Sequence, residues 1–463
     1  MCLLHFGMGA LLGLSVDEAH YALYAAHLSW SYFDHPPLVG WVQWPLVALG
    51  APTAVLRLVP ALLWLGTMLL VYRLANRLQN ALSPDAVVDA ESQQRGAQAG
   101  LWAVLALCLA PLVHVLGIGL LPDTLLVFFT VALMDVTLTL MDKVAVQRLA
   151  NWVLLGVLLK SRHAWLAIVI AVLLVMPVAW WNYQNHWISF TYQAEHGTGG
   201  GWQAVHFFRF LLVQVLAYGP LLFWAGAGVR QTVGANRCRL VLFFALPFAL
   251  FAALSGGGTG LPHWTAPAWV ALAPFSGLGL AHALRQGRRA AIGVFVVLQA
   301  LACAGVLGLM LSAGVPLVSG AQGQGSLEAP SNPFADLYGW DAAGQRARAL
   351  AAQNNLDSVS VQNWTLASRL GWYARPLPVH VLEDRFDQFD LWAGDLPVGG
   401  STLLVDWSQL AYAVPLGAHG FADCALLDTQ AVSRLGAPIS TFRFYACHRW
   451  SGAPQPRLQG AAP

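Results

Sequence analysis

Charged residues are scarce in this sequence. Only 10% of its 463 residues are Asp, Glu, Lys or Arg, whereas 57% are hydrophobic. Soluble domains carry roughly 25% charged residues, so this composition excludes an ordinary soluble protein and predicts one that lies in a membrane bilayer. The net charge is only +2 and the basic residues are scattered along the chain. We therefore expect no nucleic-acid partner.

Several motifs are also lacking. The chain shows neither internal repeats nor the paired interruptions of apolar segments that are typical of transporters. The glycine-rich stretch Ser255–Gly260 lacks the Lys-Ser/Thr ending of a phosphate-binding loop. No cysteine spacing resembles a zinc site. No small-residue cleavage site follows the first apolar segment, so that segment is expected to stay as an anchor.

The apolar runs predict about nine membrane spans, the first of them short. They lie at 1–14, 55–78, 99–118, 122–141, 164–181, 205–228, 240–255, 266–284 and 290–314. Crossing the hydrocarbon core takes about 20 residues, so either the start of the first span is missing or residues entering the Asp17 stretch complete it. Residues 38–50, interrupted by Pro45, are more typical of an interfacial helix.

The positions of the basic residues predict the orientation. Fifteen Lys and Arg precede residue 318, and all but Arg57 and Arg209 fall in alternate loops. By the positive-inside rule those loops are cytoplasmic. The other loops then face outward. They place a set of acidic and histidine side chains on one side of the membrane: Asp17, Glu18, Asp34, Asp123, His196 and His263.

The composition changes near residue 318. We predict a transmembrane domain at 1–318, a Gly-, Ser- and Pro-rich linker at 319–334, and a small α/β domain outside the membrane at 335–463. Within the last domain, we predict a helix at 341–353 and strands at 357–362 and 401–406. Cys424 and Cys447 are either a disulfide or two buried thiols, and an oxidising compartment favours the disulfide. The expected fold class is a mainly α polytopic membrane protein with a small carboxy-terminal α/β domain.

The stretch Asp17–Pro37 holds three carboxylates and three histidines in an otherwise apolar region. Carboxylates at the mouth of a membrane segment are costly unless they are solvated or used. Asp17, at the edge of a low-dielectric region, is our candidate for a general base. Arg57 and Arg209 either grip a phosphate or extend toward lipid headgroups. Asp135 lies in the middle of a span and either has a polar partner inside the protein or lines a path for a lipid phosphate.

At these residues the chain resembles a known family. Val16–Tyr21 and Tyr32–Pro37 are similar to the first outer loop of bacterial relatives of the dolichyl-phosphate-mannose protein mannosyltransferases. The aminoarabinose transferase that modifies lipid A belongs to the same GT-C superfamily. The resemblance covers nearly the whole chain in order, through these further segments: Leu121–Asp123, Trp181–Asn182, His186–Phe190 with Gln193, Pro262–Ala268, Tyr338–Trp340 and Phe386–Trp392.

The resemblance implies a glycosyltransferase with a GT-C-like fold. Such an enzyme takes a sugar from a polyprenyl-phosphate carrier and passes it to lipid A, another glycolipid or a protein hydroxyl. Asp17 matches the family's catalytic acid, Glu18 is its neighbour, and Asp123 matches a second acidic position in the same cavity. We expect Asp17 and Asp123 to share one wet pocket, with substrate contacts at these residues: Tyr21, Asp34, His35, Arg57, Arg209 and His263.

Two alternatives stay open. One is a lipid or sugar transporter or flippase without chemistry. The other is an inactive, shortened relative, because residues 142–181 are compact and carry Lys160–His163 where relatives have a Ser-Lys-Tyr-like motif. His196, His263 and the acidic pair Asp17 and Glu18 include the ligand types for a divalent metal, but no spacing demands one, and no cofactor is assigned.

Overall fold

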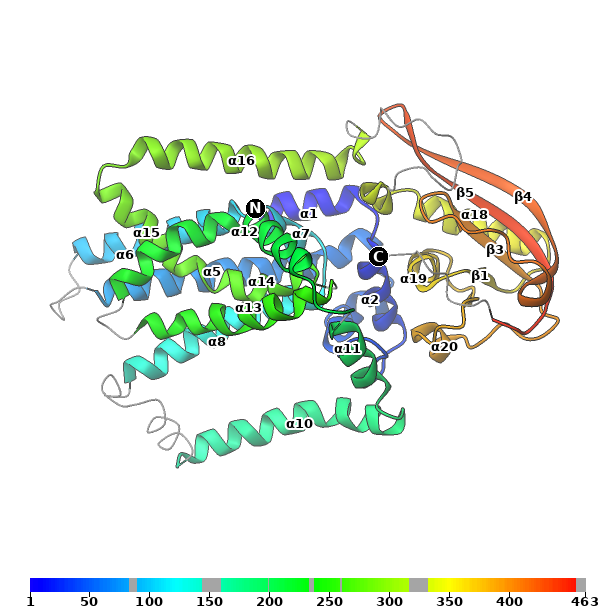
Figure 1. Cartoon of the computed structure of the whole chain (residues 1–463), viewed down its shortest axis with the longest axis horizontal. Helices are drawn as coiled ribbons and strands as arrows, with labels where there is room; N and C mark the ends of the chain where they lie inside the picture. Colours follow the sequence, from blue (N-terminus) through cyan, green and yellow to red (C-terminus); the bar gives the residue numbers. More distant parts are fainter. Residues whose placement is uncertain are drawn as a thin grey trace. The chain divides into compact units, whose positions relative to one another are not determined.

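The computed structural model describes residues 1–82, 90–143, 160–198, 200–232, 237–258, 260–315 and 332–454. It is mainly helical and has one five-stranded sheet near the carboxyl end (Figure 1). Within the described ranges, 6 helices are long and apolar enough to cross a membrane, and 3 bent helix pairs bring the number to 9. The protein is therefore a multi-pass membrane protein, and the predicted fold class is confirmed.

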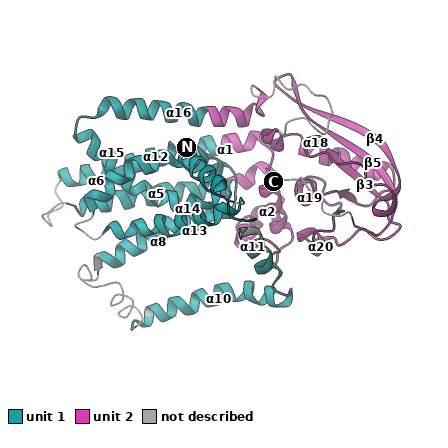
Figure 2. Ribbon diagram, in the orientation of Figure 1, with its two compact units in different colours: residues 1–6, 58–304 teal, residues 7–57, 305–463 magenta. Residues whose placement is uncertain are grey.

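The contacts divide the chain into two compact units (Figure 2). Unit 1 comprises Met1–Phe6 and Leu58–Ala304, and unit 2 comprises Gly7–Arg57 and Gly305–Pro463. Unit 2 is thus discontinuous in sequence, because the predicted outer loop near the amino end groups with the carboxy-terminal region. Most of the predicted linker at 319–334 lies outside the described residues.

Unit 1 consists of helices. They are α5 (Leu58–Asn80), α6 (Ala90–Cys108), α7 (Pro111–Ile118), α8 (Pro122–Lys143), α10 (Arg162–Gln184), α11 (Ile188–Thr198), α12 (Ala204–Thr232), α13 (Leu242–Leu254), α14 (Ala266–Val270), α15 (Ala273–Arg285) and most of α16 (Arg289–Leu311), with 3₁₀ turns at Arg237–Val241, Ser255–Gly257 and Pro262–Thr265. The predicted spans at 99–118 and 266–284 fall in two of the bent pairs, α6 with α7 and Pro262–Val270 with α15, whose bends are 84° and 59°.

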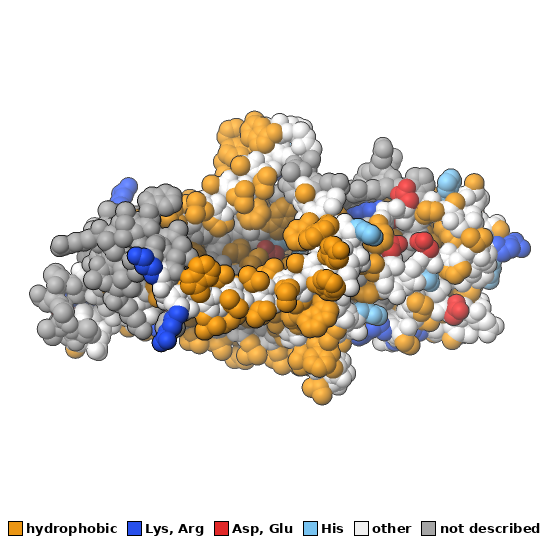
Figure 3. Space-filling view, turned by 90° about the horizontal axis from the view of Figure 1, so that it is seen from below, with side chains coloured by type: hydrophobic (Ala, Val, Ile, Leu, Met, Phe, Trp, Pro, Cys, Tyr) orange, Lys and Arg blue, Asp and Glu red, His pale blue; other side chains and the backbone are white. Residues whose placement is uncertain are grey.

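Two features of unit 1 follow from its sequence. Gly228 on α12 and Gly277 and Gly279 on α15 lie where a Cβ atom would collide with a neighbouring helix, so these glycines let α12, α15 and α6 approach closely. The hydrophobic side chains that face outward are numerous (Figure 3). Helix α10 shows this most clearly, since none of its most apolar 18-residue stretch is buried, as suits a helix surrounded by hydrocarbon.

The amino-terminal part of unit 2 is a set of short helices. Helix α1 (Cys2–Leu11) begins in unit 1 and ends in unit 2, and it meets α2 (Val16–Ala26) at an angle of 89°. The predicted short first span is therefore continued by the Asp17 stretch, with a sharp bend. Residues 38–50 form α3 (Leu38–Trp41) and α4 (Trp44–Ala48), and a 3₁₀ helix, η1, spans Thr53–Arg57.

The carboxy-terminal part of unit 2 is an α/β arrangement. Its helices are η7 (Pro333–Leu337), α18 (Trp340–Gln353), α19 (Trp364–Tyr373), α20 (Gln388–Trp392) and η8 (Gly417–His419). Its strands are β1 (Val359–Val361), β2 (Val379–Val381), β3 (Thr402–Trp407), β4 (Phe421–Arg434) and β5 (Ala437–Trp450), in the order β2-β1-β3-β5-β4. Strand β1 runs parallel to β2 and β3, and β5 runs antiparallel to β3 and β4.

The predicted helix at 341–353 and the predicted strands near 357–362 and 401–406 are confirmed as α18, β1 and β3. The disulfide is confirmed too: Cys424 and Cys447 face each other across β4 and β5 and are bonded. One hydrophobic core joins the two parts of unit 2, because Leu14, Ala19 and Leu23 pack in the same buried cluster as Trp340 and Leu370.

Candidate functional site

Helix α2 begins with a capping box that fixes its first turn. The Ser15 hydroxyl accepts a hydrogen bond from the Glu18 backbone N–H, and the Glu18 carboxylate accepts one from the Ser15 backbone N–H at 3.0 Å. This is the Ser-x-x-Glu pattern that starts many helices. Asp17 and Glu18 therefore lie in the first turn, where the partial positive charge of the helix end favours carboxylates.

Glu18 is bound by Arg57. Arg57 Nε donates to Oε1 of Glu18 at 2.9 Å, and Nη2 donates to Oε2 at 2.8 Å. The same guanidinium donates to the backbone carbonyls of Gly9 and Gly13 at 2.7 and 2.8 Å. Arg57 is only 2% exposed, so its donors are largely engaged within unit 2. Its guanidinium fixes the corner between α1 and α2.

Asp17 is partly exposed and, within the described ranges, makes no hydrogen bond or ion pair. Its charged neighbour is Arg369, a fully buried residue of α19. The Arg369 guanidinium lies 4.0 Å from the ring centre of Trp340 and forms an ion pair with Asp336. Burial lowers the pKa of Arg369 to about 9, and the Asp17 carboxylate acts in the opposite direction. Asp17 thus has a free carboxylate beside a fixed positive charge.

A second acidic centre lies at Asp34. His35 Nδ1 is 3.1 Å from Oδ2 of Asp34, and His20 Nε2 is 3.5 Å from Oδ1. The Tyr24 hydroxyl donates to Asp34, and the Tyr21 hydroxyl lies 3.3 Å from His35 Nε2. Burial alone would raise the pKa of Asp34, but the two imidazoles offset this and hold that pKa well below its ordinary value. Asp34 is therefore a carboxylate at neutral pH.

Three predicted site residues lie in unit 1. Asp123 follows Pro122 in the first turn of α8, as predicted, and is largely buried. His263 Nε2 lies 3.8 Å from its Oδ2 atom. Arg209, on α12, is exposed and forms no ion pair with any residue of the described ranges. That Asp17 and Asp123 share one pocket stays a prediction.

Asp135 has a structural partner. Its Oδ1 atom lies 2.7 Å from Arg77 Nη1 and 3.3 Å from Arg73 Nε. Of the two readings of this mid-span acid, the polar partner is the one found. Arg77 also donates to the Thr139 hydroxyl at 2.9 Å, so this group joins α5 to α8 within unit 1.

The described residues include some, but not all, of the side chains named above as possible ligands for a divalent metal. Within the described ranges, no group of three or more His, Cys, Asp or Glu is placed to hold a metal ion. The side chain of His196, one of the ligand types named above, lies outside the described set. No metal is therefore assigned a role.

Sequence reasoning missed several residues around Asp17 and Asp34. His20 Nδ1 lies 3.0 Å from the Ser368 hydroxyl, and Asp336 accepts a hydrogen bond from the backbone N–H of Val16 at 3.2 Å. These partners come from more than 300 positions further along the chain, and Arg369 is equally distant. The segment Tyr338–Trp340, which is part of the family resemblance, could have indicated this region, because the Arg369 guanidinium stacks on the Trp340 ring.

The chain is similar to two solved crystal structures of ArnT from Cupriavidus metallidurans, one in the apo state and one bound to undecaprenyl phosphate. The TM-scores are 0.57 and 0.52, and the sequence identity is 17% in both. Each match covers 98% of this chain, and 97% and 98% of the ArnT chains. The chain therefore has the fold of these ArnT structures, as the resemblance predicted. No protein-family model and no curated protein matches the sequence.

Proposed function

We propose that this protein transfers a sugar from a polyprenyl-phosphate carrier to an acceptor hydroxyl, with Asp17 as the general base. Support for the lipid donor comes from the fold, since one of the two similar ArnT structures is bound to undecaprenyl phosphate. The alternate placement of Lys and Arg supports a site on the periplasmic side of the inner membrane. The acceptor is lipid A, another glycolipid or a protein hydroxyl.

The contrast between Asp17 and Glu18 carries the proposal. A general base needs a carboxylate oxygen with free lone pairs that can approach the acceptor hydroxyl. Both Glu18 oxygens accept hydrogen bonds from Arg57, and the residue is buried. Asp17, one position earlier, is partly exposed and has no such partner in the described part of the chain. Glu18 then positions the helix turn from which Asp17 acts.

We propose roles for the remaining predicted site residues from their exposure and their partners. Tyr21 and His35 are proposed contacts to the donor or acceptor in unit 2, next to the Asp34 carboxylate. In unit 1, the exposed Arg209 is the proposed partner for the departing phosphate, because a guanidinium can grip phosphate with two parallel hydrogen bonds. Asp123 and His263 are proposed to orient substrate. Arg57 is proposed to act through Glu18 rather than on the phosphate.

The test compares Asp17→Asn with wild-type protein in membranes supplied with a polyprenyl-phosphate-linked sugar and an acceptor extract. Loss of a general base lowers turnover by about 10²–10⁴-fold, while the KM for the donor lipid and the thermal unfolding midpoint stay near wild type. Asp428→Asn removes the same charge from an ion pair on strand β4 and is the matched control. Full transfer by Asp17→Asn would exclude Asp17 as the base. If the wild-type protein moves donor lipid across vesicles without forming product, it is a flippase.

A further inference from the structure

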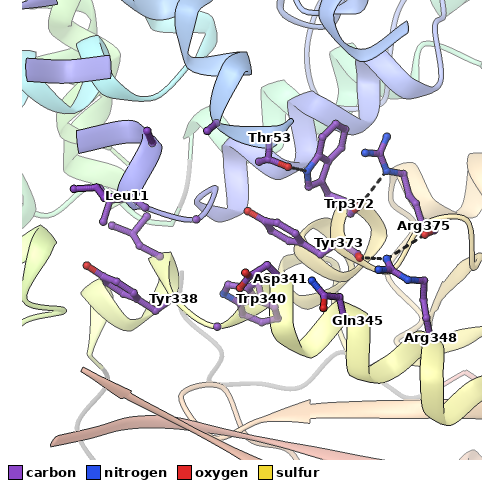
Figure 4. A pocket seen from close by; sticks show the side chains of 16 residues that line it. Leu11, Thr53, Tyr338, Trp340, Asp341, Gln345, Arg348, Trp372, Tyr373 and Arg375 are labelled. Atoms are coloured by element: carbon purple, nitrogen blue, oxygen red, sulfur yellow. Dashed lines mark hydrogen bonds between the residues drawn. The ribbon is translucent and has the colours of Figure 1, made fainter. Parts of the chain in front are cut away.

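Unit 2 contains a cavity of about 560 Å³ that none of the predicted site residues lines. Its walls come from the end of α1, the start of η1, the end of η7, the first nine residues of α18, and the end of α19 with Arg375 just beyond it (Figure 4). All of these segments belong to unit 2. A cavity of this size accommodates a small-molecule group.

Two arginines stand at one end of the cavity. Arg348 Nη1 donates to the backbone carbonyls of Tyr373 and Arg375 at 2.6 and 3.2 Å. Arg375 donates through Nε to the Trp372 carbonyl at 3.0 Å, and its guanidinium lies 3.5 Å from the Trp372 ring centre. These contacts fix both groups, yet neither arginine forms an ion pair in the described part of the chain. Two fixed guanidiniums without a carboxylate partner suit a phosphate.

The other end of the cavity is apolar. Ala10, Leu11 and Leu12 line it, and Leu11 is 68% exposed. In Figure 4, Leu11 and Tyr338 lie at the end away from Arg348 and Arg375. Leu11 is the last residue of α1, an apolar helix with no charged side chain. A ligand held by the arginines would thus meet a surface that suits hydrocarbon.

A single acid sets the charge of the cavity. Asp341 lies seven residues before Arg348 on α18, so both are on the same face, about 10 Å apart along the helix axis. With two arginines and one aspartate, the lining carries a net charge of +1. One negative charge balances it, which favours a phosphodiester over a doubly charged phosphomonoester.

We propose that this cavity binds the headgroup of a singly charged phospholipid. The phosphodiester lies between Arg348 and Arg375, and the acyl chains leave past Leu11. This site is separate from the residues assigned to sugar transfer, and it does not rest on the proposed function: Asp17→Asn is expected to bind the phospholipid as wild type does.

The experiment measures binding of dioleoyl-phosphatidylglycerol to the delipidated full-length protein in detergent by native mass spectrometry. Arg348→Gln and Arg375→Gln are each expected to weaken binding by about tenfold or more, since each removes charge-assisted hydrogen bonds. Arg346→Gln is the matched control, because it removes the same charge from α18 but its side chain pairs with Asp428 at 2.6 Å. Asp341→Asn is expected to tighten binding by about twofold, a gain that a folding defect does not produce.

Three results would overturn the proposal. Wild-type affinity in both Arg348→Gln and Arg375→Gln, or an equal loss in Arg346→Gln, would remove the arginine site. Equal binding of dioleoylglycerol, which lacks the phosphate, would leave only nonspecific hydrocarbon adsorption. Equal binding of glycerol phosphate, which lacks the chains, would assign the cavity to a soluble phosphate. Weak binding of both fragments, together with the arginine effects, supports the phospholipid.

Discussion

Two neighbouring segments of unit 2 each hold an aspartate with a shifted pKa, and the two shifts have opposite directions. The segments adjoin, because the Phe33 and Phe386 rings are 5.6 Å apart and the Phe33 N–H donates to Gln388 at 2.7 Å. Beside Phe33, Asp34 is held by two histidines, and its pKa lies well below the ordinary value. Beside Phe386, Asp387 caps α20, and burial raises its pKa to about 8.

The difference lies in the partners rather than in the burial. Asp387 accepts a hydrogen bond from the Phe389 N–H at 2.7 Å, but its Oδ2 atom is buried without a partner among the described residues. The nearby carboxylates Asp390 and Glu383 raise its pKa further. His20 and His35 lower the pKa of Asp34, whereas at Asp387 the smaller lowering effect of Arg385 does not offset burial and the two carboxylates. At neutral pH Asp34 is therefore a carboxylate, whereas Asp387 is a neutral acid.

Of the substitutions that test this comparison, Asp34→Asn is expected to lower the free energy of unfolding most. It removes the carboxylate that His20, His35 and the Tyr24 hydroxyl contact, and we expect the free energy of unfolding at pH 7 to fall by about 2–3 kcal/mol, because these polar groups lose their shared partner. Because the pKa of Asp34 is lowered, this contribution is present above its ordinary value of 3.8 and is lost as the pH falls below it. Chemical unfolding in detergent, followed by tryptophan fluorescence, measures the difference.

Asp423→Asn serves as the control for that measurement. Asp423 pairs with Arg449 at 2.9 Å, but both side chains are more than half exposed, at 54% and 73%. Its loss should change the free energy of unfolding little. If the two variants lose stability equally, burial and the histidine partners contribute nothing to the Asp34 pairing.

Asp387→Asn sharpens the comparison through the pH dependence of stability. Because the folded-state pKa of Asp387 is raised from 3.8 to about 8, the folded protein holds a proton that the unfolded chain releases. Stability from this group is thus complete below about pH 4 and declines as the pH rises toward 8. The variant lacks this decline, so its unfolding midpoint should exceed that of wild type increasingly from pH 5 to pH 8 and by a constant amount above. If the difference between the two unfolding midpoints did not change with pH, the raised pKa of Asp387 would be contradicted.

Of the three substitutions, His35→Gln is expected to have the smallest effect on the free energy of unfolding. The His35 side chain is 33% exposed, so solvent screens its pairing with Asp34, and we expect a loss of about 1 kcal/mol or less. His20→Gln, at a side chain that is 3% exposed, should cost more. The same unfolding titration ranks the two variants, and a larger loss for His35→Gln would reverse our view of which histidine holds Asp34.

The sequence predicted unit 1 better than the surroundings of the acids. A membrane span is a local property, because about 20 consecutive apolar residues define it, and the predicted spans correspond to helices or bent pairs. The bend between Leu11 and Val16 was not predictable, since it depends on Arg57 binding the Gly9 and Gly13 carbonyls. The long hairpin of β4 and β5 was also missed. Much of β4 is exposed, so its sequence lacks a continuous hydrophobic pattern.

The candidate site shows the same limit. The motif around Asp17 was visible in the sequence, and so was Asp123 behind Pro122. The distant residues near Asp17 and His20 were not, because Arg369, Asp336 and Ser368 are brought there by tertiary packing alone. Buried ion pairs between distant residues leave no periodic pattern in the chain.

The discontinuous course of unit 2 has a consequence for biosynthesis. The stretch around Asp17 leaves the ribosome about 350 residues before Arg369, which at about 5–20 residues per second is a delay of tens of seconds. During that interval the translocon must insert the helices of unit 1, while Leu14, Ala19 and Leu23 lack the carboxy-terminal residues that later cover them. A nascent chain released before α19 is made would therefore carry the Asp17 stretch on an unassembled, degradation-prone segment.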